Sequence, residues 1–415
     1  MQNKKATDTV EHLFRNEYGK VIALLTSKYG VAYLEKIEDA IQDAFIKAMR
    51  LWAFKDIPDK PTAWLFRVAN NALIDGLRRD KKMSYLEDSK TAEAAGSRVE
   101  LATKDELTDS QLKMIFACCH PALSEEHQLI LSLKLIGGFS NKELAEALLK
   151  KEETVAKSFT RAKKKFKNKV QFLQIPIQMG LQSRLFVVLR VIYLLFSEGY
   201  ATTTGSQMVK QDICYESLRL ALLLRENKYC RHPNLEALIA LMCFHAARFD
   251  SRLDENGDLV SLEFHDRSKY SKELIKIAEY HLENSGTLDR LPSNYHLEAA
   301  VSYYHCSAKT FEKTDWKSIL YLYDLQLKQQ FSPIAALNRI VPYAKVYGAK
   351  KALTVLEVLE EKTNFGSNSL FYAIKADLFF QLENDKAHQE HLQKAIRLSK
   401  NELVKKHLRK KIRKV

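Results

Sequence analysis

Apolar residues recur at helical spacing along most of the chain, and this pattern predicts an all-α protein. Between residues 37 and 52 they recur at i, i+3, i+4 and i+7, so we expect a long amphipathic helix with an acidic N-terminal half. A loop with two prolines follows at 53–61, and a second helix is expected over 62–79. The first helix should bury Ile37, Ala40, Ile41, Ala44, Phe45, Ala48, Met49 and Trp52 and expose Glu38, Asp39, Gln42, Asp43, Lys47 and Arg50.

The second helix carries polar side chains on the side opposite its apolar stripe. An aromatic ring, two asparagines and three arginines beside a proline-edged loop could hold an unstacked base and its phosphates. An ordinary solvated helix face is the alternative. The expected packed residues are Trp64, Leu65, Val68, Ala69, Ala72 and Leu73, whereas Arg67, Asn70, Asn71, Arg78 and Arg79 remain for a partner.

A helix-turn-helix is predicted over residues 141–169. Ser140 and Glu143 have the spacing of a capping box, which favours the start of a helix at this point. A break at 150–151 separates this helix from a second one, whose acidic first turn suits the positive end of the helix dipole. The apolar side of the first helix consists of Leu144, Ala145 and Leu148.

The second helix of this motif should bury an apolar stripe and present basic residues on its other side. The stripe consists of Val155, Phe159, Ala162 and Phe166, and the outer side of Lys157, Thr160, Arg161, Lys164 and Lys165. A solvated lysine-rich surface is the simpler interpretation of such a face. However, a capped helix, a tight turn and a second helix with basic outward residues form the arrangement that places a recognition helix in the major groove. We therefore expect this helix to bind DNA.

Residues 80–109 are polar and poor in large apolar side chains, which predicts a flexible linker. The linker would join a helical domain at 8–79 to a second one at 110–172. Ahead of the helix-turn-helix, one further helix is expected, built on Ile115, Phe116, Leu129, Leu131 and Leu135.

The remaining segment, 175–415, is helical throughout by pattern. Two antiparallel helix pairs are expected, 332–347 with 350–362 and 369–382 with 386–398, each joined by a Gly or Asn turn. Their period is close to the roughly 34 residues of tetratricopeptide-like arrays, although the repeat is degenerate. Such arrays bind peptides or proteins along a concave face, and a purely structural extension is the alternative.

Two charged stretches of this segment are expected to have no ligand. The sequence DENGD at 254–258 matches the start of a calcium loop, but Leu259 and His265 stand where such a loop requires glycine and a bidentate glutamate. We therefore expect a turn. The basic end at 400–415 is expected to be a solvated tail, with a frayed helix or a polyanion contact as the alternatives.

Composition adds an argument about partners. The 415 residues are 46% hydrophobic, which suffices for ordinary cores, and a formal net charge of +14 favours a polyanion such as nucleic acid. The longest apolar run, 185–196, is shorter than the roughly 18 to 20 residues of a membrane span and contains Arg190. Because residues 1–9 are polar as well, we expect a cytoplasmic protein without a membrane segment.

Neither a catalytic nor a metal site is predicted. The sequence has no phosphate-cradling glycine loop, nucleophile elbow or metal-ligand pattern, so we expect no enzyme and no cofactor. The six cysteines lack framework spacing and are expected to be reduced. Cys118, Cys119 and His120 suggest a metal site, but neighbouring residues on a helix point about 100° apart, so packing is the preferred interpretation.

The order of several motifs resembles a bacterial RNA polymerase sigma factor of the extracytoplasmic-function class, in the subgroup with a long helical C-terminal extension. The first two domains contribute EDAIQDAF (38–45), PTAWLFRVANNALIDGLRR (61–79), ACCHPALSEEHQLILSLKLIGGFSNKELA (117–145) and EETVAKSFTRAKKKF (152–166). The extension contributes VIYLLFSEGYA (191–201), DENGD and HDRSKY (254–270), and DWKSILYLYDLQLKQQFSPIAALNRIV (315–341). The resemblance implies two small helical domains joined by a linker and followed by a degenerate tetratricopeptide-like domain.

The resemblance also implies that core RNA polymerase and promoter DNA are the partners. Asp39, Gln42 and Asp43 would dock on the clamp of the largest polymerase subunit. The loop at 53–61 and the helix after it would capture a flipped base of the −10 promoter element. The −10 contacts would come from Lys55, Lys60, Trp64, Arg67, Asn70, Asn71, Arg78 and Arg79. The −35 contacts would come from Lys157, Thr160 and Arg161, with Lys163, Lys164 and Lys165 on phosphates.

The extension would modulate this activity through a regulatory protein or a ligand. A different class of function stays open, namely a helix-turn-helix transcription regulator with a helical protein-binding scaffold that acts without polymerase. Only a sigma factor needs the docking helix and the base-capture loop. Ala156, Lys157 and Ser158 stand where the class often has arginine or serine, so the promoter sequence stays open as well.

Overall fold

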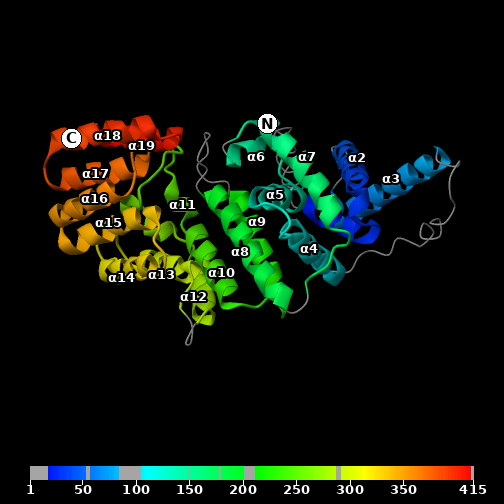
Figure 1. Ribbon diagram of the computed structural model, residues 1–415, viewed down its shortest axis with the longest axis horizontal. Coiled ribbons are helices and arrows are strands. Elements are labelled where there is room, and N and C mark those ends of the chain that lie inside the picture. Colours follow the sequence, from blue (N-terminus) through cyan, green and yellow to red (C-terminus); the bar gives the residue numbers. More distant parts are fainter. Residues whose placement is uncertain are drawn as a thin grey trace. The chain divides into compact units, whose positions relative to one another are not determined.

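The computed structural model describes residues 17–52, 57–83, 104–148, 150–176, 179–200, 211–286 and 291–412. These residues form helices and loops, with no strand beyond one isolated bridge between Leu253 and Leu259, so the predicted all-α class is confirmed. The chain divides into two compact units, a first unit of residues 1–195 and a second unit of residues 196–415 (Figure 1).

The described part of the first unit consists of helices and turns. It begins with a helix over 17–29 and a 3-10 turn, η1 (Val31–Tyr33), and continues with α2 (Leu34–Trp52) and α3 (Pro61–Met83). Next come α4 (Lys104–Cys118), α5 (Glu125–Leu131), a π-helical turn (Ser132–Ile136), α6 (Asn141–Ala147), α7 (Glu152–Lys169) and α8 (Met179–Tyr200). The division between the two units falls within α8.

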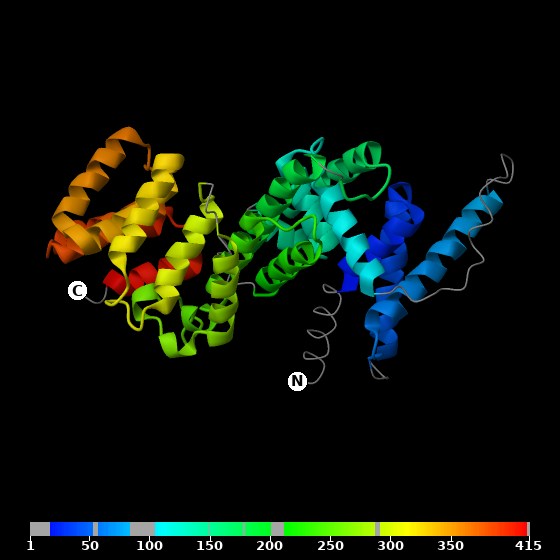
Figure 2. The same cartoon turned by 90° about the horizontal axis from the view of Figure 1, so that it is seen from below.

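Helix α2 packs against α3 through much of the apolar stripe that the sequence predicted (Figures 1 and 2). Ile37 and Ile41 are fully buried, as is Leu65 of α3. Two positions differ from the prediction: Met49 is 49% exposed, and Glu38 is buried. The packed stripe therefore covers the middle of α2 and leaves its last turns more open.

The predicted helix-turn-helix is present as α6 and α7. The hydroxyl of Ser140 accepts a hydrogen bond from the backbone N–H of Glu143 at 3.2 Å, and the Glu143 carboxylate accepts one from the backbone N–H of Ser140 at 2.8 Å. Both halves of the capping box are thus formed. Helix α7 begins at Glu152 and buries its predicted stripe, Val155, Phe159, Ala162 and Phe166.

The single helix predicted before this motif is in fact two helices. Helix α4 ends at Cys118, and the backbone turns through residues 119–124 before α5 begins. Ser124 is the N-cap of α5, because its hydroxyl accepts a hydrogen bond from the backbone N–H of His127. Pro121 and the cap residue Ser124 were the sequence signals for this break.

The helices on either side of the expected linker are longer than predicted. Helix α3 continues to Met83 instead of ending at Arg79, and Arg, Lys and Met are good helix formers. Helix α4 already begins at Lys104. The part of the expected linker at 84–103 lies outside the described residues, so its flexibility stays a prediction.

Among the described residues, α8 is the one helix that is both long and apolar enough to be a candidate membrane span. Its residues 180–200 are long and apolar enough to cross a membrane by length and composition, a test that the core helices of soluble proteins also pass. In the first unit α8 lies against protein: Arg184 donates to the backbone carbonyl of Phe116 in α4, and Arg190 forms a 2.7 Å ion pair with Glu125 of α5. Leu185, Val188, Leu189 and Ile192 are buried.

The second unit is an array of helices joined by short loops (Figures 1 and 2). Its helices are α9 (Gln211–Glu226), α10 (Pro233–Ala246), α11 (Phe249–Arg252), α12 (Lys272–Asn284), α13 (Asn294–Ser307), α14 (Trp316–Gln329), α15 (Pro333–Tyr347), α16 (Ala349–Lys362), α17 (Ser369–Gln381), α18 (Asp385–Leu398) and α19 (Glu402–Ile412). Helix α10 packs against α9, α12 and α13, and every residue from 235 to 244 is buried. Its near-continuous apolar sequence follows from this position, since each of its sides is covered.

Both predicted helix pairs of the extension are confirmed, as α15 with α16 and α17 with α18. Gly348 joins the first pair with a φ of 89°, in the left-handed region that favours glycine. Asn384 caps α18, because its side chain accepts a hydrogen bond from the backbone N–H of Ala387. Leu337, Leu356 and other apolar residues of these helices share one core.

The basic C-terminal end is not the solvated tail that the sequence predicted. It forms α19, whose Leu408 is buried, and its lysines pair with acidic residues of the same unit. Lys410 lies 2.7 Å from the carboxylate of Asp258, and Lys411 lies 2.9 Å from that of Asp377. The predicted turn at 254–258 is confirmed: Gly257 has a φ of 74°, and Asp254 accepts hydrogen bonds from the backbone of the turn.

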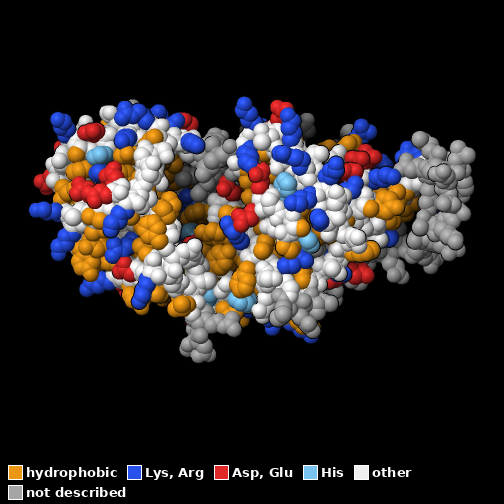
Figure 3. Space-filling model, in the orientation of Figure 1, with side chains coloured by type: hydrophobic (Ala, Val, Ile, Leu, Met, Phe, Trp, Pro, Cys, Tyr) orange, Lys and Arg blue, Asp and Glu red, His pale blue; other side chains and the backbone are white. Residues whose placement is uncertain are grey.

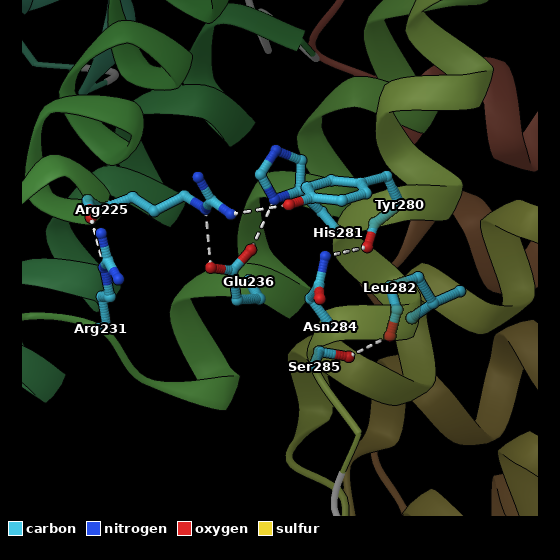
Figure 4. Close-up of polar contacts among 8 residues, drawn as sticks. All are labelled: Arg225, Arg231, Glu236, Tyr280, His281, Leu282, Asn284 and Ser285. Atoms are coloured by element: carbon cyan, nitrogen blue, oxygen red, sulfur yellow. Dashed lines mark hydrogen bonds and ion pairs between the residues drawn. The ribbon is translucent and has the colours of Figure 1, made fainter.

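A buried carboxylate connects three helices of the second unit (Figure 4). Glu236 of α10 accepts a 2.7 Å hydrogen bond from Nε of Arg225 in α9, and its other oxygen lies 2.5 Å from Nδ1 of His281 in α12. Arg225 also donates to the hydroxyl of Tyr280 at 3.4 Å. The charge of this arginine is therefore balanced within the unit.

Candidate nucleic-acid interface

The outer side of α7 presents the basic residues that the sequence predicted for DNA. Figure 3 shows Lys and Arg side chains gathered over α7, with acidic side chains beside them. Two of the polar groups are already engaged, since Lys157 pairs with Glu153 at 2.6 Å and the Thr160 hydroxyl donates to the carbonyl of Ala156 at 3.0 Å. The Lys157 pair is largely exposed, so water and salt weaken it and a phosphate can replace the carboxylate. All five predicted positions, Lys157, Thr160, Arg161, Lys164 and Lys165, are exposed.

The position of α7 depends on a glutamate that the sequence reasoning missed. Glu126 of α5 accepts a 2.9 Å hydrogen bond from the hydroxyl of Ser158 in α7 and forms a 2.7 Å ion pair with Lys150 in the turn. The hydrogen bond from Lys150 lowers the pKa of Glu126, so the carboxylate stays charged. Ser158 is therefore a buried anchor of α7 and not part of its outer face.

Two other lysines of α7 point toward α2 within the first unit. Lys163 lies 2.7 Å from the carboxylate of Glu38, with only 17% and 11% of the two side chains exposed. Lys167 lies 3.2 Å from that of Glu35. The expectation that Lys163 faces phosphates is therefore not met in this structure, because Lys163 forms an ion pair with the buried carboxylate of Glu38.

The residues predicted to dock on polymerase lie on the open side of α2. Asp39, Gln42 and Asp43 are all exposed, and their i, i+3, i+4 spacing places them on one side of the helix. None of them forms an ion pair with another residue of the described part of the chain. The carboxylates of Asp39 and Asp43 are thus available to a basic partner.

Most of the residues predicted for the −10 element lie on the outer side of α3. Trp64 is half-buried, and its ring centroid lies 5.2 Å from that of Trp52, so the last residue of α2 contacts the first turn of α3. Their positions on either side of the loop at 53–61 were a sequence signal for the pair. Lys55 lies outside the described residues. The exposed members of the set are Lys60, Arg67, Asn71, Arg78 and Arg79.

Asn70, which the sequence placed on the outer side, is fully buried. Its side-chain oxygen accepts a 2.7 Å hydrogen bond from the hydroxyl of Tyr29 and a 3.4 Å one from the ammonium group of Lys28. The prediction of an exposed Asn70 was wrong because helical spacing alone cannot foresee a polar partner from another helix. This side chain joins α3 to the helix over 17–29.

The cysteine and histidine residues of the first unit do not form a ligand set. Cys118 and Cys119 are fully buried, and burial raises the pKa of Cys119 to about 12, so this thiol stays protonated. In the described parts of the chain, no three His, Cys, Asp or Glu side chains gather in a way that could hold a metal ion.

Three family models match successive parts of the chain. Sigma-70 region 2 matches residues 13–83, sigma-70 region 4 matches residues 113–166, and a family of unknown function (DUF6596) matches residues 184–286. The region 2 match contains α2 and α3, and the region 4 match contains the helix-turn-helix.

Two curated proteins are similar to the chain. The uncharacterized protein R00370 of Rhizobium meliloti (strain 1021) is 31% identical over 372 residues, which cover 89% of this chain and 87% of that protein. RNA polymerase sigma factor YlaC of Bacillus subtilis (strain 168) is 28% identical over 152 residues, which cover 35% of this chain and 82% of that protein. No solved structure matches the chain.

The matches to regions 2 and 4 fall, in this order, on the helices that carry the acidic face of α2 and the basic face of α7. The similarity to a sigma factor extends over 152 residues, and the similarity to the Rhizobium meliloti protein extends over nearly all of the chain. The chain therefore belongs to the sigma-70 family of RNA polymerase sigma factors.

Proposed function

We propose that this protein is an extracytoplasmic-function sigma factor that docks on core RNA polymerase through α2, opens the −10 element with α3 and reads the −35 element with α7. The observation that carries the proposal is an exposed, unpaired acidic face on α2 together with an exposed basic face on α7. A helix-turn-helix regulator that acts without polymerase needs the basic face of α7 but not the acidic face of α2. Binding to core polymerase therefore separates the two functions.

Charge reversal tests the docking face. The double variant Asp39→Lys, Asp43→Lys should weaken binding to core RNA polymerase by about tenfold or more, because two attractive charges become repulsive. The matched control is Glu357→Lys, Glu361→Lys, which changes two exposed positions at the same spacing on α16 and should bind normally. Binding is measured by titrating labelled protein with core polymerase. Equal affinities of the two double variants would contradict docking through α2.

For the −35 element, we assign base contacts to Lys157, Thr160 and Arg161 and phosphate contacts to Lys164 and Lys165. These positions recur at three- and four-residue intervals, so they follow one side of α7. Glu126 supports this assignment, since it holds Ser158 at the buried edge of this face and so limits the rotation of α7 about its axis.

Substitutions on α7 should separate base readout from phosphate binding. Arg161→Ala or Lys157→Ala should cost about 1 to 3 kcal/mol at the cognate −35 element and relax its sequence preference. Lys164→Ala should weaken binding to cognate and scrambled duplexes alike. Fluorescence anisotropy with both duplexes measures the difference. If Arg161→Ala lowered the affinity for both duplexes equally, α7 would contact phosphates only.

For the −10 element, we propose contacts from Lys55, Lys60, Trp64, Arg67, Asn71, Arg78 and Arg79. The half-buried Trp64 ring, paired with Trp52 at one edge of the 53–61 loop, offers a stacking surface for an unpaired base. Asn70 is left out of this set, because its buried hydrogen bond with Tyr29 supports α3 from within.

We further propose that the second unit, with its degenerate tetratricopeptide-like helix pairs, modulates transcription by the first. Support comes from its size and order, since residues 211–286 and 291–412 form packed helices that α2, α3 and α7 do not need for their own contacts. A regulatory protein or a ligand would act on it.

Truncation tests this modulation. A chain that ends at Tyr200 keeps α8, whose Arg184 contacts α4, whereas a cut near residue 174 would remove α8 and uncover that side of the first unit. We expect transcription by the shortened protein to differ from that of the full chain, in either direction, once circular dichroism has shown that it is folded. A folded truncated protein with the same output in vitro and in cells would contradict modulation.

A further inference from the structure

Three arginines of the second unit lie together without a balancing carboxylate. We call Arg248, Arg252 and Arg267 the arginine cluster. Arg248 and Arg252, which begin and end α11, are 5% and 8% exposed, and Arg267 lies in a 3-10 turn that packs against α11. None of the three forms an ion pair with another described residue. All three fall within residues 184–286, matched by the family of unknown function.

Neutral groups hold Arg248 and Arg252 in place. One terminal nitrogen of Arg248 donates to Nδ1 of His245 at 2.6 Å and to the hydroxyl of Tyr200 at 3.4 Å. Arg252 donates to the backbone carbonyl of Tyr200 at 2.8 Å, and its guanidinium carbon lies 3.8 Å from the centre of the Tyr200 ring. The Nε atom of Arg248 is buried and has no hydrogen-bond partner.

Arg267 is anchored in the same way. One terminal nitrogen donates to the backbone carbonyls of His305 and Ala308, at 2.5 and 2.7 Å. The other terminal nitrogen is buried without a partner, as is Nδ1 of His305. Arg248 and Arg267 thus each keep one buried nitrogen that has no hydrogen-bond partner.

The histidines around the cluster respond to its positive charge. Burial, with Arg248 and Arg267 adding to it, lowers the pKa of His305 to about 3. Burial lowers the pKa of His265 to about 4 and that of His245 well below its ordinary value, and the positive charges of Arg248 and Arg252 add to both shifts. These rings are therefore neutral, and they neither add positive charge nor balance the charge of the arginines. Two described carboxylates lie near the cluster: Glu279, which interacts with Cys306, and the exposed Glu312, which interacts with the charge of Arg267. Neither forms an ion pair with the three arginines.

Other arginines of the same unit show what the cluster lacks. Arg225 shares the buried carboxylate of Glu236 (Figure 4), and Arg339 pairs with Asp324 at 2.5 Å. Removing an arginine from water without such a partner costs several kcal/mol, and a guanidinium does not lose its proton to avoid this cost. The missing charge is therefore best supplied by a ligand.

We propose that the arginine cluster is a binding site for a small oxyanion, the phosphate or carboxylate group of a soluble ligand. The guanidinium group suits this role, because its N–H groups match the oxygens of both anions and its charge persists at every physiological pH. The anion would accept hydrogen bonds from the free nitrogens of Arg248 and Arg267. This inference does not rest on the sigma activity, since it concerns only the contacts within the second unit.

Calorimetric titration of the full-length protein with inorganic phosphate and with acetate, in a chloride buffer of constant ionic strength, tests the site. We expect saturable binding of at least one anion at one site per chain. Saturation by phosphate alone or by acetate alone identifies the chemical group of the ligand. Arg248→Met should weaken this binding by about tenfold or more, because it removes a charged donor. Arg339→Met, which removes an arginine that already has a carboxylate, should bind the anion normally.

Thermal unfolding gives a second readout. Without added anion, Arg248→Met should be at least as stable as the unmodified protein, because it replaces an unbalanced buried charge with an apolar side chain. Phosphate also stabilises proteins without a specific site, and the shift measured with Arg248→Met gives the size of that general effect. Only the unmodified protein and Arg339→Met should gain the additional, saturable stabilisation.

Two results would overturn the proposal. One is the absence of saturable binding for both anions up to about 10 mM, a concentration at which even a weak specific site would begin to fill. The other is a large loss of stability in anion-free Arg248→Met with unchanged anion binding. That pattern would mean that Arg248 is compensated within the protein and serves packing alone.

Discussion

The ion pair between Glu38 and Lys163 is the contact on which the arrangement of the first unit depends. The side chain of Glu38 is buried at the edge of the α2 stripe, and a carboxylate in that position needs a positive partner within the protein. Lys163 of α7 supplies this charge, and Lys167 does the same for the more exposed Glu35. Adjacent positions on the two helices remain open, namely the acidic face of α2 and the basic face of α7. Any binding event that draws the two helices apart would remove Lys163 and leave Glu38 with the hydroxyl of Tyr18 and the nearby charge of Lys134.

Charge balance also distinguishes the parts of the second unit. The C-terminal lysines pair with Asp258 and Asp377, and Arg225 pairs with Glu236, so the positive net charge of the chain is neutralised locally at many points. The arginine cluster differs from these pairs, because its contacts are with a tyrosine, neutral histidines and backbone carbonyls. Such contacts orient a guanidinium but leave its charge uncompensated. A region matched by a family without a known function thus contains a specific chemical feature that can be tested.

Periodicity and capping were enough to predict most helices of this chain. The capping box at Ser140 and the start of α7 at Glu152 are local features, set by residues three or four positions apart. The break before α5 was missed, because the apolar residues on both sides of the turn were assigned to one helix, although Pro121 and Ser124 mark the turn in the sequence. The exposed positions on α2 and α7 follow from the same periodicity, whereas their roles at polymerase and DNA came from the resemblance to a family.

The errors concern polar residues whose partners lie far away in the sequence. Glu38 and Asn70 fall at polar positions by pattern, yet Lys163 and Tyr29 make their burial possible. The arginine cluster could not be found either, since its members and their contacts extend from Tyr200 to Ala308. Local pattern therefore predicts which residues form a helix, whereas tertiary contacts decide which polar side chains are buried.

The central claim is that this protein confers promoter-specific initiation on RNA polymerase. It is tested most directly by run-off transcription in vitro, with core polymerase, the full-length protein and the DNA upstream of its own coding sequence as template. We expect a transcript with a single start site that requires both the protein and the upstream DNA. The absence of any transcript that depends on the protein, together with specific binding of the same DNA without polymerase, would contradict the claim and favour a helix-turn-helix regulator.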